Sequence, residues 1–246
     1  MDIQTRPRHS AAMNDIGAAI TAAVQLIIGR DPDLIEIVLL SMKVSLSALA
    51  IATVIALPLG AGLALTRFPL RTPILVLLNA LMGLPPVVVG LLVYLALSRA
   101  GPLGVFGLLF TPTAMIVAQT VLIVPIIASI TRQVIEDMWE DYAEPLRSLG
   151  ASPAKAALTL LWDGRHSLLT AVLAGLGRAM AEVGAVMIVG GNIDHVTRVM
   201  TTAIALEVSK GDLALALGLG IVLIAISILI NGGAYLLRSA DRPERA

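Results

Sequence analysis

The chain has no cysteine and little charge. Without cysteine it cannot form a disulfide, bind a metal through a thiolate or use a thiolate nucleophile. Charged residues are 14% of its 246 residues, against roughly 25% in soluble domains. The 17 basic and 17 acidic residues cancel, so the overall charge gives no reason to expect binding to nucleic acid.

Several catalytic motifs are missing as well. No Gly-x-x-x-x-Gly-Lys-Ser/Thr loop occurs, so any ATP hydrolysis must belong to another polypeptide. There is no His-Glu-x-x-His motif, and His9, His166 and His195 are too widely spaced to pair as metal ligands. We therefore expect no catalytic residue, no metal site and no cofactor bound by this chain.

Apolar residues are abundant. They make up 57% of the chain, and the mean hydropathy is +0.91. A soluble fold of this size lacks the interior to bury so much apolar surface, so part of it must face lipid. Stretches long enough to cross a bilayer, about 20 residues, occur at five places: 37–64, 74–97, 108–131, 168–192 and 213–237. Each should be helical, because lipid offers the backbone no other hydrogen-bond partner.

The first 33 residues differ from the rest. Ile16, Ile20, Val24 and Ile27 recur at helical spacing, which predicts a short amphipathic helix at the membrane interface. A signal peptide is the alternative, because basic residues precede a short apolar run, but no small-x-small cleavage site follows.

The distribution of Lys and Arg predicts the orientation. With the C-terminus inside, the cytoplasmic segments carry nine basic residues: Arg67, Arg71, Arg132, Arg147, Lys155, Arg165, Arg238, Arg242 and Arg245. The outer segments carry six: Arg6, Arg8, Arg30, Arg99, Arg198 and Lys210. The positive-inside rule therefore places the N-terminus outside, and the tail 238–246 in the cytoplasm.

The longest connection, about 132–167, lies on the predicted cytoplasmic side and is far more polar than the spans. Residues 133–149 are compatible with a helix that Gly150 ends. Ser152 and Pro153 have the pattern of an N-cap followed by proline at the first helical position. We expect a helix, a glycine turn and a second helix that together project from the membrane.

This projection carries a recognisable motif. Residues 144–152, Glu-Pro-Leu-Arg-Ser-Leu-Gly-Ala-Ser, resemble the Glu-Ala-Ala loop of ABC-importer permeases, although proline and leucine replace its two alanines. The loop lies between the third and fourth spans, as it does in that family. The resemblance implies a coupling helix that docks in a groove of a separate ATPase subunit, which uses ATP and Mg. The residues expected to contribute are Glu144, Arg147, Gly150, Ala151 and Ser152.

A second resemblance covers residues 34–237. It rests on Arg-Ala-Met-Ala-Glu-Val-Gly-Ala at 178–185, on Gly-Gly-Asn-Ile at 190–193, on 197–207 and on 82–90. These segments are similar to permeases for tetrahedral oxyanions, most of all the tungstate branch. The resemblance implies a type I ABC importer permease fold in the cell inner membrane. It also implies a homodimer, two ATPase subunits and an extracytoplasmic oxyanion-binding protein as partners, with lipid around the spans.

The alternatives are a permease of the same type for molybdate or sulfate, a secondary transporter that works alone, and a membrane enzyme. Secondary transporters usually have internal repeats or several intramembrane ionisable residues, and we detect no repeat. A membrane enzyme would need converging acids or metal ligands within its spans, where only Arg178 and Glu182 form a charged pair.

Arg178 and Glu182 are four residues apart on one helical face of the fourth span. Each charge alone would cost about 3 kcal/mol to insert, so they are expected to neutralise each other. The pair is either structural or an anion-attracting arginine in the pathway with its counter-ion. We favour the structural role, because Glu182 would cancel the field that an oxyanion needs.

Two glycine-containing segments are further candidates for the translocation path of the anion. Pro85 and Pro86 interrupt the second span, with Gly83 and Gly90 nearby. Such a break is tolerated only where freed carbonyl groups face protein or a water-filled cavity. We therefore expect these residues to line the translocation path and act as a gate, with a packing kink as the alternative. The segment Gly190-Gly191-Asn192 either cradles an anion with its backbone N–H groups or ends the helix.

Overall fold

The protein is helical throughout its described part. The computed structural model describes residues 19–240, with side chains to 233. After a first helix, Ala19–Ile28, come α2 (Pro32–Leu65), α3 (Arg71–Met82), α4 (Pro86–Leu97), η1 (Gly104–Phe106), α5 (Pro112–Ser148), α6 (Pro153–Asp163), α7 (Arg165–Met180), α8 (Gly184–Gly190), α9 (Met200–Lys210) and α10 (Leu213–Ala240). Residues 1–18 of the expected interfacial segment and 241–246 of the expected tail lie outside the described residues.

The expected spans correspond to three continuous helices and two bent pairs. In the described part, α2, α5 and α10 are each long and apolar enough to cross a membrane. The chain bends by 106° between α3 and α4 and by 58° between α7 and α8. The prediction of an all-helical membrane fold is confirmed, as is the break at Pro85–Pro86. The unbroken helix predicted for 168–192 is wrong.

The third span also differs from its predicted bounds. Its helix begins at Pro112 instead of residue 108, with Thr111 as the N-cap, and it continues without interruption to Ser148. α5 therefore includes both a membrane span and the first half of the polar connection, even though Pro125 and Pro145 lie inside it.

The bent pair α3–α4 runs along α5 from Glu136 to the start of that helix. Arg71 at the start of α3 pairs with Glu136 of α5, whereas Leu97 at the end of α4 belongs to the same buried cluster as Ala114 and Met115 near the start of α5. From Pro112 to Glu136 a helix rises about 36 Å, enough for a hydrocarbon layer of roughly 30 Å. The pair therefore has the reach of one broken span.

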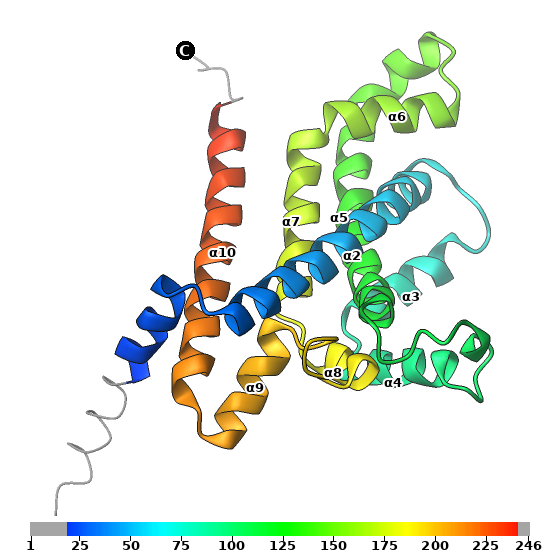
Figure 1. Cartoon of the computed structure of the whole chain (residues 1–246). Helices are drawn as coiled ribbons and strands as arrows, with labels where there is room; N and C mark the ends of the chain where they lie inside the picture. Colours follow the sequence, from blue (N-terminus) through cyan, green and yellow to red (C-terminus); the bar gives the residue numbers. More distant parts are fainter. Residues whose placement is uncertain (1–18, 241–246) are drawn as a thin grey trace, which may run out of the picture.

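The core forms where α2 packs against α5. Ala48, Ala52, Ala56 and Gly60 recur every four residues along α2 and are all buried, and small residues at this spacing let membrane helices approach closely. A Cβ atom at Gly60 would lie 2.6 Å from the carbonyl oxygen of Ala128. α2 crosses the bundle obliquely, while α10 stands at one side (Figure 1).

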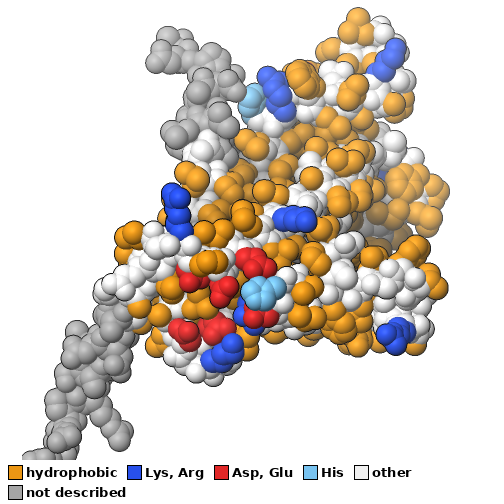
Figure 2. All heavy atoms as spheres, viewed as in Figure 1, with side chains coloured by type: hydrophobic (Ala, Val, Ile, Leu, Met, Phe, Trp, Pro, Cys, Tyr) orange, Lys and Arg blue, Asp and Glu red, His pale blue; other side chains and the backbone are white. Residues whose placement is uncertain are grey.

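The surface is largely apolar, as Figure 2 shows for one face. On α10, Ile224, Ile228 and Leu229 are 61%, 67% and 75% exposed, which suits contact with lipid or another subunit. In the helix Ala19–Ile28, Ile27 packs against the cluster formed with α2, α9 and α10, whereas Ile20 and Val24 stay exposed. Its placement at a membrane interface stays a prediction.

We expect Gly60→Ala to lower the stability of the protein by about 1–3 kcal/mol, because the added methyl group overpacks the α2–α5 contact. Gly62→Ala is the matched control, since nothing lies within 4 Å of a Cβ at that position. Thermal unfolding of both variants in detergent measures the difference. Equal melting temperatures would contradict the close approach at Gly60.

Candidate functional site

The break between α7 and α8 is built around Glu182. Its side chain is 2% exposed, and Oε2 lies 3.1 Å from the guanidinium Nη1 of Arg178. Oε1 accepts a hydrogen bond of 3.0 Å from the backbone N–H of Ala185, one of the N–H groups that the first turn of α8 leaves without a partner. The predicted ion pair is confirmed, and Glu182 has a structural task besides: it caps α8.

Side chains from two other helices meet the carbonyl groups near this break. Gln119 of α5 donates a hydrogen bond of 3.1 Å to the carbonyl oxygen of Ala179, and Thr201 of α9 donates one of 2.8 Å to that of Glu182. We did not predict either residue as functional. A signal was available for Gln119, because it is an amide within an apolar stretch.

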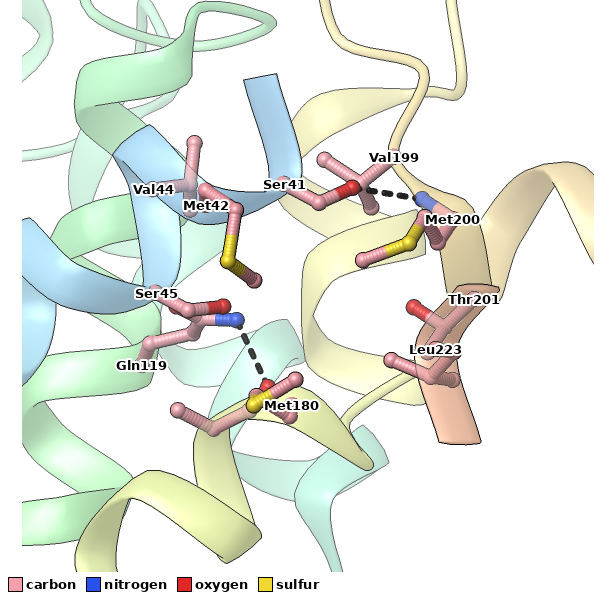
Figure 3. A pocket seen from close by; sticks show the side chains of 11 residues that line it. Ser41, Met42, Val44, Ser45, Gln119, Met180, Val199, Met200, Thr201 and Leu223 are labelled. Carbon is pink, nitrogen blue, oxygen red and sulfur yellow. Dashed lines mark hydrogen bonds between the residues drawn. The ribbon is translucent and has the colours of Figure 1, made fainter. Parts of the chain in front are cut away.

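A small cavity lies beside the break (Figure 3). Its lining includes Ser41, Ser45, Gln119 and Thr201, and its volume is about 10 Å³. The hydroxyl of Ser41 donates to the carbonyl oxygen of Ile37 and accepts from the N–H of Met200. Gln119 Oε1 is buried and has no hydrogen-bond partner among the described residues. The cavity has room for about one water molecule.

The second break lies against the first. Gly83 follows the end of α3, and Pro86 occupies the first position of α4. Beyond the break, Gly90 lets α4 approach α8, because a Cβ there would lie 2.7 Å from the Cα of Ala185. The four predicted gate residues thus have two structural roles: Gly83, Pro85 and Pro86 make the break, and Gly90 lets α4 pack against α8.

The segment Gly190-Gly191-Asn192 ends α8. Gly191 has a φ of 73°, and its N–H donates to the carbonyl oxygen of Met187 at 2.9 Å. Thr197 donates to the carbonyl oxygen of Gly190 and accepts from the N–H of Ile193. The N–H groups of Gly191 and Ile193 therefore have acceptors within the protein. The helix-ending alternative accounts for these contacts, and an anion cradle would have to displace them.

The projection consists of the end of α5, a glycine turn and α6, which lie together at the top of Figure 1. Gly150 has a φ of 66°, a left-handed conformation that glycine adopts at little cost. Ser152 caps α6 by accepting from the N–H of Lys155. The predicted helix, glycine turn and helix are confirmed.

The tip of the projection presents both apolar and charged groups. Leu149, Leu158 and Trp162 are 81%, 71% and 70% exposed. Glu144 and Arg147 are exposed too, and the guanidinium of Arg147 lies 5.5 Å from the ring centre of Trp139. Large exposed apolar side chains next to charges are typical of a protein–protein contact surface.

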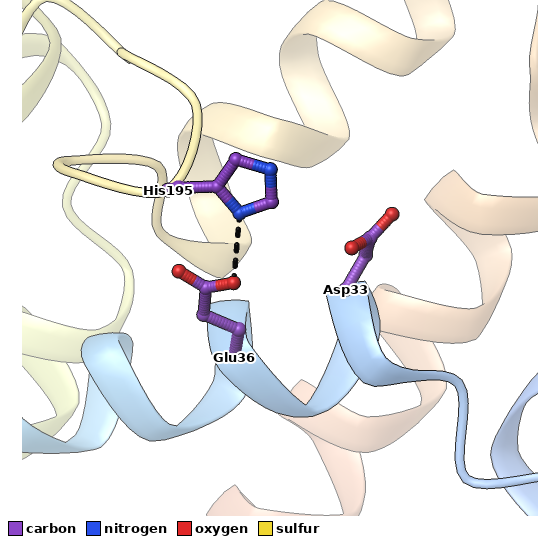
Figure 4. A group of neighbouring side chains, drawn as sticks. All are labelled: Asp33, Glu36 and His195. Carbon is purple, nitrogen blue, oxygen red and sulfur yellow. Dashed lines mark hydrogen bonds and ion pairs between the residues drawn. The ribbon is translucent and has the colours of Figure 1, made fainter.

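A group of acidic side chains around a histidine lies at the opposite end of the molecule, over the start of α2 (Figure 2). His195 Nδ1 lies 2.9 Å from Glu36 Oε2, and Asp33 lies close by (Figure 4). One ligand atom from each lies within 4.8 Å of the others, a spacing that would fit a metal ion. Asp194 pairs with Arg198 beside them. Histidine spacing alone did not predict this cluster, because its carboxylates come from α2, far from His195 in the sequence.

Two acidic neighbours raise the pKa of His195 above its ordinary 6.5. The hydrogen bond to Glu36 contributes most, and the charge of Asp194 comes second. A raised pKa means that the contact stabilises the fold below pH 6.5 and that this contribution is lost as pH rises through the higher folded value. We expect the wild type to melt above His195→Gln at acidic pH and level with it at alkaline pH. A difference that does not depend on pH would contradict this origin.

We expect Glu182→Ala to cost about 2–3 kcal/mol, because it leaves Arg178 without its counter-ion and Ala185 without a cap acceptor; the partial exposure of Arg178 keeps the loss below that of a fully buried pair. The double variant Arg178→Gln/Glu182→Gln removes both charges but keeps an amide oxygen for the cap. It should be the more stable of the two. Melting temperatures of Glu182→Ala and of the double variant test this order of stability. The two single glutamine variants complete a double-mutant cycle. A double variant as unstable as Glu182→Ala would contradict it.

Comparison with known proteins identifies the family to which this chain belongs. The family described as binding-protein-dependent transport system inner membrane component matches residues 55–240. The tungstate uptake system permease protein TupB of Peptoclostridium acidaminophilum is 40% identical over 226 residues, 92% of this chain and 99% of its own, and that of Campylobacter jejuni is 39% identical over 165 residues, 67% and 69%. A molybdenum transport system permease, ModB of Azotobacter vinelandii, is 28% identical over 212 residues, 81% and 94%. The chain belongs to the family of binding-protein-dependent ABC-importer permeases.

Proposed function

We propose that this chain is the membrane subunit through which an ATP-driven importer moves a tetrahedral oxyanion, tungstate in the first place, into the cell. The observation that carries the proposal is the projection formed by α5 and α6. It has the shape expected of a coupling element, and it displays apolar side chains that nothing within the described protein covers. Family membership implies an ATPase and a substrate-binding protein as partners, and the projection is where we place the ATPase.

The preference for tungstate rests on similarity. The tungstate permeases are about 40% identical to this chain, whereas the molybdenum permease is 28% identical. Molybdate is the alternative substrate, because the two anions differ little in size and charge. Selectivity in such importers is then expected to reside in the binding protein, and the permease needs only a path that accepts a tetrahedral dianion.

Two copies of the chain would form the path between them, each with its own ATPase subunit. The exposed apolar residues of α4, such as Leu91 and Leu92 at 51% and 58%, support a contact between copies close to the break at Gly83–Pro85. Alternating access would open and close this region when the ATPase subunits close on ATP. The chain itself performs no covalent chemistry in this scheme.

The arrangement of the ends supports the proposed orientation. The end of α10 and the projection lie at one end of the molecule, and the helix Ala19–Ile28 lies toward the other (Figure 1). If the projection meets a cytoplasmic ATPase, the C-terminal side of α10 is cytoplasmic and the start of α2 is outside. The excess of Lys and Arg in the predicted cytoplasmic segments points the same way.

We expect Leu158→Glu to abolish co-purification of the permease with its ATPase subunit, because a charge on this 71% exposed leucine would have to be desolvated in the contact. Val105→Glu is the control. Val105 is also exposed, at 89%, but it lies on η1, outside the projection. ATP-dependent accumulation of tungsten in proteoliposomes that contain binding protein and ATPase should fail for the first variant and persist for the second.

The same assay separates the alternatives. Uptake that requires no ATPase subunit would indicate a transporter that works alone and would overturn the proposal. Uptake that depends on ATP, but is faster for molybdate than for tungstate with the same binding protein, would retain the machine and change its substrate.

A further inference from the structure

A cluster of three charges lies where α2, α3 and α5 meet, close to the projection. The carboxylate of Glu136 on α5 pairs through Oε1 with Arg71, the first residue of α3, and through Oε2 with Arg132, one turn earlier on α5. The Nε of Arg71 also donates a hydrogen bond of 2.8 Å to the carbonyl oxygen of Leu63, in the last turn of α2. Glu136 and Arg71 together therefore join three helices.

These contacts differ from an ordinary surface ion pair. The side chains of Arg71, Arg132 and Glu136 are only 30%, 17% and 31% exposed, so solvent screens them less than it screens free surface charges. The carbonyl group of Leu63 is among those that a helix end leaves without an intrahelical partner, and Arg71 supplies one. Removing the charge of Glu136 would leave two arginines facing each other without their shared counter-ion.

α3 is attached to α5 a second time, closer to its end. Ser129 of α5 lies 3.4 Å from the side-chain oxygen of Asn79 on α3, and Leu78 is buried in the cluster that α2 and α5 share. Residues 71–79 therefore follow α5 along their length. Three residues after this second contact, the helix ends at Met82, and the break begins at Gly83.

The projection is attached to the same helices. Leu160 of α6, Ile135 of α5 and Ala61 of α2 are each fully buried in one cluster, and Ile135 directly precedes Glu136. A force applied to α6 thus reaches α5 and α2 through packed side chains, and reaches α3 through the carboxylate of Glu136.

We propose that Glu136 is a positioning residue that transmits the movement of the projection to α3 and thereby to the break at Gly83–Pro85. The proposal rests on the function proposed above, because it presumes that an ATPase subunit moves the projection. Without the carboxylate, α5 and α6 still follow the ATPase, but α3 is released from them at its first turn. ATP hydrolysis then continues while opening of the path lags behind it.

The first test compares Glu136→Gln with Asp137→Asn in proteoliposomes that contain the ATPase subunit and the binding protein. Asp137 is the matched control, because it is the next residue, is exposed and has no ion pair among the described residues. We expect Glu136→Gln to keep its ATPase rate and to lose about tenfold in tungsten imported per ATP hydrolysed, within the range of typical coupling energies. Asp137→Asn should keep the wild-type ratio. A wild-type ratio for Glu136→Gln would overturn the proposal.

The second test replaces the ion pair by a covalent link, and the chain suits it because it has no native cysteine. Arg71→Cys/Glu136→Cys should have a low ratio of transport to hydrolysis, and a bifunctional maleimide of matching length should restore the ratio. A merely structural role would be indicated if the cross-link restored the melting temperature and left the ratio low. A cross-link that blocked transport would show that α3 and α5 separate during the cycle. Either result would overturn the proposal.

The two proposals fail in different ways. If wild-type permease neither binds an ATPase subunit nor imports anion, the proposed function fails, and the role of Glu136 fails with it. If the wild type imports with ATP and the two glutamate experiments give wild-type ratios, only the transmission through Glu136 fails.

Discussion

A backbone that breaks inside a membrane must find all its hydrogen-bond partners within the protein, because lipid supplies none. Two spans of this permease break, and at the α7–α8 break the partners are visible. Glu182 caps α8 through Ala185, Gln119 reaches the carbonyl group of Ala179, and Thr201 reaches that of Glu182 itself. Three helices are thereby held at one point, and the positions of α5, α7 and α9 depend on it.

This requirement also explains the charge at the centre of the fold. Glu182 is needed as an acceptor where the helix changes direction, and a buried carboxylate needs a counter-ion. Arg178, one turn earlier, supplies it at 3.1 Å. The pair therefore belongs to the joint between the two half-helices. A role of Arg178 toward an anion would require this contact to loosen when the permease opens.

The region of the breaks and the end that bears the projection are constructed differently. Around the breaks, α4 and α8 meet through Gly90 and Gly184, which admit close contact, and through buried valines of both helices. At the end that bears the projection, α2, α3, α5 and α6 are joined by buried Leu160 and by the charges around Glu136. A group of helices joined to the projection is what a transporter driven through that projection requires.

Local chemistry in the sequence predicts much of this. The apolar stretches, the Pro85–Pro86 break, the cap at Ser152 and the turn at Gly150 each follow from a few neighbouring residues. The break after Met180 could not be predicted in this way, because no proline marks it and its small residues also suit a continuous packed helix. Its partner Gln119 is 60 residues away from Ala179, and Arg71 and Glu136 are 65 apart, so only the folded chain brings these contacts together.

If Glu136 transmits the movement, the projection and α3 move as one body. Spin labels on Ala154→Cys in α6 and Val76→Cys in α3, both exposed positions, report the distance between them in the assembled transporter when doubly labelled subunits are diluted with unlabelled ones. We expect the same distance distribution in the nucleotide-free and ATP-bound states, while accessibility at Gly83–Gly90 changes. A shift of the α6–α3 distance on ATP binding would contradict it.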